Sequence, residues 1–349
     1  MMEPSKPLYG LRLVSTGVAV VALGLASMVQ TFGATIGPFE FMAERGVASA
    51  TCLAVVSVGE AEECQKRWSA RLGAMLPLHF EDEVAGAIAK GCGAVLLDGV
   101  PIDATDLERL ASFEASGGGV GLLGVRAGHP EAAHPLTALA GVEVMRVPDA
   151  LGIQRKGNGA LAAGLQPWER VHVLRDTRRV AAAAPAAELK WSEGVSPESG
   201  AAGWRGEPRG GRLAWLAVRP DAVLNEASER RAMDRIVLAM VAWLARRPFA
   251  EAVSFDSPEL VVGIVPGGPR RFVLSLTNRA DWATPELAFR VHLNRPTAGV
   301  DVGLTTIELS GRHAFRATRV ESGVFTLTVP PLEGGSSRSY TLDVAEEAA

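Results

Sequence analysis

Short apolar runs alternate with helical patterns of hydrophobic residues between residue 51 and about residue 249. Each run has the length of one buried strand. The predicted strands cover residues 51–58, 75–80, 94–98, 120–125 and 213–218. Strands separated by helices in this way are typical of a parallel sheet with helices on both faces. We therefore expect an α/β domain over residues 48–249.

The most regular helical pattern follows the last of these strands. Six apolar side chains recur at the spacing of one helix face, at Met233, Ile236, Val237, Met240, Val241 and Leu244. Pro248 follows the predicted end of this helix. Residues 150–210 are less regular and rich in Gly, Pro and Ala, so we expect them to form a contact or lid region.

The pattern changes after Pro248. Short, partly alternating segments rich in Val, Thr and Phe follow at a spacing of about ten residues, and Gly and Pro separate them. They cover residues 260–265, 272–278, 287–293, 303–309, 315–320, 324–329 and 339–344. Seven such segments predict an antiparallel β-sandwich over residues 253–345.

A third pattern occupies the amino terminus, where the 27 residues between Arg12 and Glu40 carry no charge. Residues 13–36 are long enough for a helix that crosses the lipid bilayer. Lys6 and Arg12 precede the segment and no positive excess follows it. We therefore expect a single-pass protein of the cytoplasmic (inner) membrane, with a cytoplasmic stub and anchor over residues 1–38 and the bulk of the chain periplasmic or extracellular.

Two other interpretations of this segment stay open at the level of sequence. A cleaved signal peptide could end near Gly24-Leu25-Ala26, although the uncharged run continues beyond that point. A buried helix of a soluble domain is the other, although such a helix normally has a polar face. If the segment is either an anchor or a signal peptide, the folded part lies across the membrane.

Composition limits the classes of partner. The chain has 349 residues, of which 48% are hydrophobic and 21% are charged, as in an ordinary globular protein. Its net charge of −4 provides no basic excess for binding a phosphate backbone, so we expect no nucleic-acid partner.

The three cysteines, Cys52, Cys64 and Cys92, form no recognisable disulfide framework, because their number is odd and no CxxC spacing occurs. Cys52 and Cys92 lie in or beside apolar runs, where cysteine is usually a small core residue. A bridge between these two could form, but nothing in the pattern favours it. The six His residues are scattered without HxH or HxxxH spacing, so we expect no metal site and no cofactor.

A glycine-rich segment at residues 117–130, GGGVGLLGVRAGHP, resembles the nucleophile turn of class I glutamine amidotransferase-like domains. In that family a strand leads into Gly-Ile-Cys-x-Gly-His at a tight turn before a helix. Gly124, Val125, Gly128 and His129 match this motif. The position of the nucleophilic cysteine falls on Arg126.

A second, weaker match concerns the family's His-Pro-Glu, which follows a late strand and falls on Arg219-Pro220-Asp221. The order of DGVP, a helix, the glycine-rich strand and GRLAWLAV also resembles ThuA-like relatives. This resemblance covers about 200 residues and implies a flavodoxin-like fold. The segment PPLEGG at residues 330–335 resembles the closing turn of bacterial immunoglobulin-like domains.

The departure from the family motif has a chemical consequence. Amide hydrolysis by this family needs a thiolate that attacks and an imidazole that transfers the proton. Arginine does neither, because it stays protonated and has no lone pair free for attack. With Arg126 and Arg219 at the reactive positions, Asp221 is the remainder of a degenerate triad. We therefore expect no catalytic residues and a pseudoenzyme.

The same turn contains candidate ligand-binding residues. A glycine-rich turn can hold an anion with its backbone N–H groups, and an arginine would strengthen the binding, so we select Arg126, Gly128 and His129. Alternatively, Arg126 pairs with a nearby carboxylate and the histidine is a surface residue. Asp98 ends a strand at the carboxyl edge of the sheet, where it either faces a ligand or caps the turn before Pro101.

Together these features indicate a noncatalytic scaffold or interaction subunit of a membrane or envelope complex, with other membrane or envelope proteins as partners. One alternative is a carbohydrate-active or carbohydrate-binding envelope protein, for which a pocket should hold two carboxylates about 5–10 Å apart. Another is a small-anion sensor at the Arg126 turn.

Overall fold

The computed structural model describes residues 50–345 except residues 74, 148–149, 158, 175–178, 185–186, 193–199, 224–225, 256, 258, 269, 296, 306–312, 316 and 322. The predicted anchor at residues 13–36 lies outside the described residues. Within them, no helix is both long enough and apolar enough to cross a membrane.

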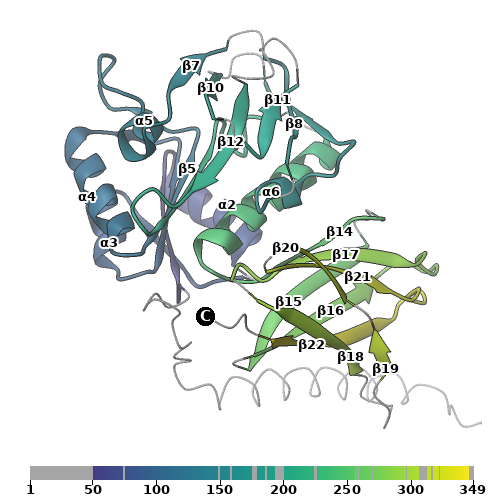
Figure 1. Cartoon of the computed structure of the whole chain (residues 1–349). Coiled ribbons are helices and arrows are strands. Elements are labelled where there is room, and N and C mark those ends of the chain that lie inside the picture. Colours follow the sequence, from purple (N-terminus) through teal and green to yellow (C-terminus); the bar gives the residue numbers. More distant parts are fainter. Residues whose placement is uncertain are drawn as a thin grey trace, which may run out of the picture. The chain divides into compact units, whose positions relative to one another are not determined.

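Five parallel strands form the first half of the main sheet, and they confirm the strands predicted from the apolar runs (Figure 1). Along the sheet they lie in the order β2 (Leu78–Glu81), β1 (Leu53–Ser57), β3 (Ala94–Asp98), β5 (Gly119–Leu123) and β13 (Arg212–Leu216). The last three of these strands are buried along their whole length, which explains why their sequences are apolar apart from Asp98 and Arg212 at strand ends.

Helices cover both faces of this half of the sheet, as predicted. Figure 1 shows α3 (Val84–Ala89) and α4 (Ala104–Ala115) on one side, and α2 (Ala61–Leu72) and α6 (Ala227–Leu244) on the other. The apolar stripe of α6 is buried against the sheet, with Met233, Ile236 and Met240 inaccessible to solvent. A shorter helix, α5 (Pro135–Ala140), contacts α4.

The expectation of a purely parallel sheet is wrong, because the sheet is mixed. Beyond β13 the order continues with antiparallel strands, namely β12 (Ala201–Gly206), β11 (Leu189–Trp191), β8 (Gly152–Arg155) and β9 (Arg170–His172). Two further strands, β7 (Val144–Arg146) and β10 (Val180–Ala182), branch from β12. Antiparallel neighbours need no crossover helix. In the described part of this region the one helical segment is a short 3-10 helix, η2 (Ala162–Gly164), between β8 and β9. Much of the region predicted as a contact or lid segment is therefore part of the sheet.

Two antiparallel sheets follow α6, and the change of pattern after Pro248 predicted them. The four-stranded sheet has the order β14 (Phe249–Ala252), β17 (Leu287–His292), β21 (Val324–Val329) and β20 (Ala317–Glu321). The five-stranded sheet has the order β15 (Leu260–Gly268), β16 (Arg271–Asn278), β22 (Ser337–Ala345), β18 (Gly299–Thr305) and β19 (His313–Phe315). Both sheets contribute to one apolar core, which includes Phe272, Phe289, Leu327 and Tyr340.

Cys52 and Cys92 form a disulfide, which the sequence pattern did not favour. Cys52 precedes β1, and Cys92 lies two residues before β3. Since Leu53 pairs with Ala94 in the parallel ladder, the two cysteines meet where neighbouring strands begin. The third cysteine, Cys64 on α2, is buried and is not part of a disulfide.

Candidate functional site

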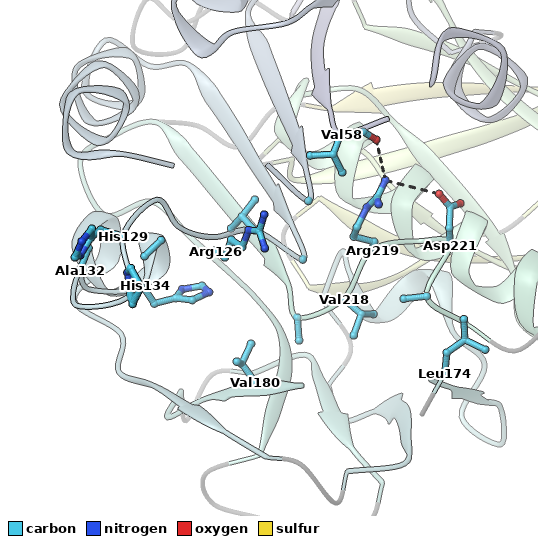
Figure 2. Close-up of a pocket in the computed structure, with 17 residues that line it drawn as sticks. Val58, Arg126, His129, Ala132, His134, Leu174, Val180, Val218, Arg219 and Asp221 are labelled. Carbon is cyan, nitrogen blue, oxygen red and sulfur yellow. Dashed lines mark hydrogen bonds and ion pairs between the residues drawn. The ribbon is translucent and has the colours of Figure 1, made fainter. Parts of the chain in front are cut away.

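A pocket of about 600 Å³ lies at the carboxyl ends of the parallel strands (Figure 2). Its lining includes Val58 after β1, Gly99 after β3, Gly124 after β5 and Val218 after β13. Open α/β sheets bind their ligands at this edge, because the loops that follow the strands converge there. The pocket is therefore the candidate site of the α/β domain.

The structure brings together most of the residues that the sequence selected. Arg126, His129, Arg219 and Asp221 all line this pocket, so the three positions of the degenerate triad share one site. Gly128 does not line it. Its N–H donates to the carbonyl oxygen of Ile102 at 2.7 Å, so Gly128 helps to fix the loop.

The loop after β5 differs from a nucleophile turn. Gly124 has the left-handed backbone, with a φ of 54°, and Arg126 then begins the short strand β6 (Arg126–Ala127). This strand pairs with β4 (Pro101–Ile102), and the next helix, α5, starts only at Pro135. The expected tight strand-to-helix turn at Arg126 is therefore wrong. An inserted strand and loop separate the sheet from the helix.

Asp98 has a role different from the two that the sequence suggested. Its side chain has no solvent exposure and does not line the pocket. It accepts hydrogen bonds from Ser57 Oγ at 2.6 Å, from Arg67 Nη2 at 2.8 Å and from Arg219 Nε at 2.8 Å. These donors occupy both carboxylate oxygens, so Asp98 positions the two arginines instead of capping the turn before Pro101.

Arg219 is held at the wall of the pocket by this interaction. The Asp98 carboxylate accepts hydrogen bonds from Arg219 and raises the pKa of the guanidinium above its ordinary value, against the opposing effect of burial. Arg219 Nη2 also lies 4.0 Å from Asp221 Oδ2. The side chain at this triad position is thus a firmly protonated cation, which cannot accept a proton as an imidazole does.

Three arginines and three aspartates form one continuous set of ion pairs at this wall, which we call the arginine–aspartate network. Its members are Arg67, Arg71, Asp98, Arg219, Asp221 and Asp234. Asp221 receives Arg67 Nη1 at 2.5 Å and Arg71 Nη2 at 2.9 Å. Three positive and three negative charges make the network neutral as a whole.

Arg67 and Arg71 were not among the residues selected from the sequence. Both lie on α2, one turn apart, and therefore on the same helix face. The i, i+4 spacing is a weak signal, since it normally marks a solvated helix surface. The fold brings these cations to Asp98 and Asp221 through the packing of α2, which contacts β2 and α6.

His129 and His134 come from the loop between β6 and α5. The Nδ1 atom of His134 accepts a hydrogen bond from the N–H of Leu136 at 3.1 Å, and His129 Nδ1 accepts one from the N–H of Glu131 at 3.4 Å. An Nδ1 atom that accepts a hydrogen bond carries no proton.

No thiol and no hydroxyl side chain occurs among the described residues that line the pocket. The buried thiol of Cys64 lies near the network, with Sγ 3.7 Å from Ser57 Oγ and 3.8 Å from Arg67 Nη2, but it does not line the cavity. Asp221 is the single carboxylate in the lining that the structure describes, and it is engaged by Arg67 and Arg71.

Away from the pocket, Cys52, His79 and Cys92 have their potential metal-ligand atoms within 4.8 Å of one another. The two sulfur atoms are bonded to each other. Cysteine binds a metal ion as the thiolate, which a disulfide does not offer. In the oxidised state of the structure, this group is therefore a disulfide beside a histidine.

No family model matches the chain, and no curated protein matches it. Among solved structures, a β-galactosidase from the haloarchaeon Halorubrum lacusprofundi has a TM-score of 0.37 and 14% identity. That match covers 86% of this chain and 40% of the β-galactosidase, so this chain spans well under half of that protein.

Two further solved structures show similarity of the same order. The exo-β-1,4-mannosidase Op5Man5 from Opitutaceae bacterium strain TAV5 has a TM-score of 0.39 and 12% identity, over 56% of this chain and 37% of that one. A GMP synthase-type protein from Thermoplasma acidophilum has a TM-score of 0.37 and 9% identity, over 56% of this chain and 96% of that one. Similarities at this level do not assign the chain to a family.

Proposed function

We propose that this chain is a membrane-anchored, catalytically inactive amidotransferase-like protein that acts as an extracytoplasmic scaffold or interaction subunit of a membrane or envelope complex. Its ThuA-like α/β domain would have a flavodoxin-like parallel half, followed by an immunoglobulin-like sandwich. One observation carries the proposal. Arg126 and Arg219, which align with the nucleophile and the proton-transferring histidine of the motif, both line the pocket at the carboxyl edge of the sheet.

The disulfide supports the extracytoplasmic part of the proposal. Disulfides persist in oxidising compartments such as the periplasm and are rare in the cytosol. The Cys52–Cys92 bond agrees with a chain whose residues 13–36 form an anchor and whose bulk lies across the membrane.

Buried polar contacts join the α/β domain to the sandwich. Arg212 on β13 donates to the carbonyl oxygens of Trp243 at 2.5 Å and Asn294 at 3.0 Å, and burial lowers the pKa of Arg212 to about 10. The buried carboxylate of Glu251 on β14 lies 3.8 Å from Arg155 on β8. Residues 47–349 accordingly form one compact unit.

A carbohydrate-active site is less well supported at this pocket. Glycoside hydrolysis uses two carboxylates that flank the bond to be broken. The lining described here provides one, Asp221, and ion pairs with Arg67 and Arg71 hold it.

Two measurements on the full-length chain, extracted in a mild detergent, test the proposal. Ammonia release from glutamine should not exceed the rate without protein, and measurable turnover would contradict an inactive domain. The extracted protein should also migrate as a complex of defined composition with other envelope proteins. If native mass measurement finds a monomer without partners, the scaffold role is wrong.

A further inference from the structure

Arg126 is a positive charge of the pocket that pairs with no carboxylate among the residues that the structure describes. The side chain of Arg126 is exposed and makes no hydrogen bond or ion pair with any residue that the structure describes. The other arginine of the lining, Arg219, belongs to the arginine–aspartate network, which is neutral as a whole. An arginine that is already paired with carboxylates of the protein has little affinity for an anionic ligand. Of the two arginines in the lining, Arg126 is therefore the one available to bind such a ligand.

The described lining provides no unengaged carboxylate beside Arg126. His129 and His134 line the same pocket, and the Nδ1 atom of each accepts a backbone hydrogen bond. In the view of Figure 2, Arg126 lies between His134 and Arg219. The one carboxylate of the described lining, Asp221, is engaged by two arginines of α2. The electrostatic character of the pocket around Arg126 is therefore that of an anion site.

Much of the remaining lining is apolar. Side chains of Val58, Val125, Leu174, Val180 and Val218 contribute to the walls. A cavity of about 600 Å³ is large enough for a small organic molecule, and apolar walls favour a ligand that brings an aliphatic body with its charge. Inorganic anions such as phosphate would leave these walls without a partner.

We propose that this pocket binds a small aliphatic carboxylate, whose carboxylate group is held by the guanidinium of Arg126 and whose hydrocarbon part packs on the apolar walls. The planar fork of arginine matches a carboxylate in a bidentate arrangement. Binding of this kind involves no covalent step and does not depend on the scaffold role.

A series of fatty acids tests the inference by titration calorimetry on the full-length chain in detergent. The probes are acetate, butyrate and hexanoate, with hexanamide as the neutral isostere of hexanoate and inorganic phosphate as the polar anion. Affinity should rise by up to about fourfold for each methylene group that becomes buried. Hexanamide should bind at least about tenfold more weakly than hexanoate, because it lacks the charge.

Variants of Arg126 test whether its guanidinium is the group that binds the carboxylate of hexanoate. Arg126→Gln should weaken hexanoate binding by about 10- to 100-fold, which is the range for losing a charged hydrogen-bonding pair. Arg126→Lys keeps the charge without the fork and should fall between Arg126→Gln and the unmodified chain. Arg279→Gln, at an exposed arginine of the sandwich that does not line the pocket, is the matched control and should leave the affinity unchanged.

Three results would overturn the inference. The first is that hexanoate shows no saturable binding, although cooperative unfolding shows that the chain used in the titration is folded. The second is equal affinity in Arg126→Gln, or an equal loss in Arg279→Gln, which would show that the pocket charge is not responsible. The third is phosphate binding more tightly than hexanoate, which would assign the site to an inorganic anion.

Discussion

The Nε atom of Arg219 lies 2.8 Å from Oδ1 of Asp98, so a carboxylate without solvent exposure fixes a guanidinium that lines the pocket. A second arginine, Arg67, reaches the same carboxylate from α2 at 2.8 Å. The buried carboxylate of Asp98, at the end of β3, is thus shared between Arg67 of α2 and Arg219, and it links the sheet to this helix.

Asp98→Asn should destabilise the fold, because it removes the buried charge that Arg67 and Arg219 share and leaves Asp221 as their remaining carboxylate in the network. Removing one partner of a buried ion pair costs about 3–5 kcal/mol, and we expect about 3 kcal/mol because the arginine side chains keep 22–30% of their exposure. The free energy of unfolding in urea measures the effect. Asp343→Asn, which breaks the exposed Arg271–Asp343 pair, is the control and should change much less. Equal losses in both variants would contradict the role assigned to Asp98.

The disulfide gives a second prediction. The bond closes a loop with a sequence separation of 40 residues, and the loop-entropy relation gives about 4 kcal/mol of stabilisation. Cys52→Ser with Cys92→Ser should lower the free energy of unfolding by about that amount and make it insensitive to reductant. Cys64→Ala should retain full sensitivity to reductant, because Cys64 is outside the disulfide. If reductant does not change the stability of the unmodified chain, the bond does not form in the protein.

The sequence predicted the central parallel strands well because β1, β3, β5 and β13 are buried over nearly their whole length and are therefore mainly apolar. The edge strand β2 is only partly buried. The antiparallel half escaped prediction because its strands are short and poor in β-branched residues. Strand β12 reads AAGWRG, and β11 has three residues. Neither the length nor the composition of such segments distinguishes them from loop.

The candidate site was predictable only in part. The motif resemblance selected Arg126 and Arg219, and the structure places both in one pocket. The partners of Asp98 were not predictable, because Arg67 is 31 residues and Arg219 is 121 residues from it along the chain. The short strand β6 between β5 and α5 was not predictable either. Its two residues lie within a glycine-rich segment and are too few to show the alternation of apolar and polar residues that marks a strand.

Two glycines with left-handed backbones give a matched test of how the pocket wall is packed. Gly124 has a φ of 54°, and an added Cβ would lie 2.8 Å from the backbone nitrogen of Arg219. Gly141 has a φ of 68° and nothing within 4 Å of an added Cβ. Gly141→Ala should cost about 1 kcal/mol, from the backbone conformation alone.

Gly124→Ala should cost more, about 3 kcal/mol, because a steric overlap with Arg219 adds to the same backbone penalty. The difference between the two variants in free energy of unfolding isolates the close contact between the β5 and β13 loops. Equal costs would show that the loops separate easily, and that the pocket wall is not rigid.

The last prediction concerns the resemblance itself, through Arg126→Cys combined with Arg219→His. This double variant restores the reactive residue types of the amidotransferase motif, yet we expect no ammonia release from glutamine above the background rate. Catalysis needs the thiol on a tight turn within reach of the imidazole, and residue 126 lies on the extended strand β6, outside any such turn. The change at residue 219 also removes one of the two cations that neutralise Asp98. Thiol titration confirms that the new cysteine is reactive, and Arg126→Ser with Arg219→His supplies the background. Turnover above that background would mean that the two positions retain catalytic geometry, and the domain would then differ from an active enzyme only by its side chains.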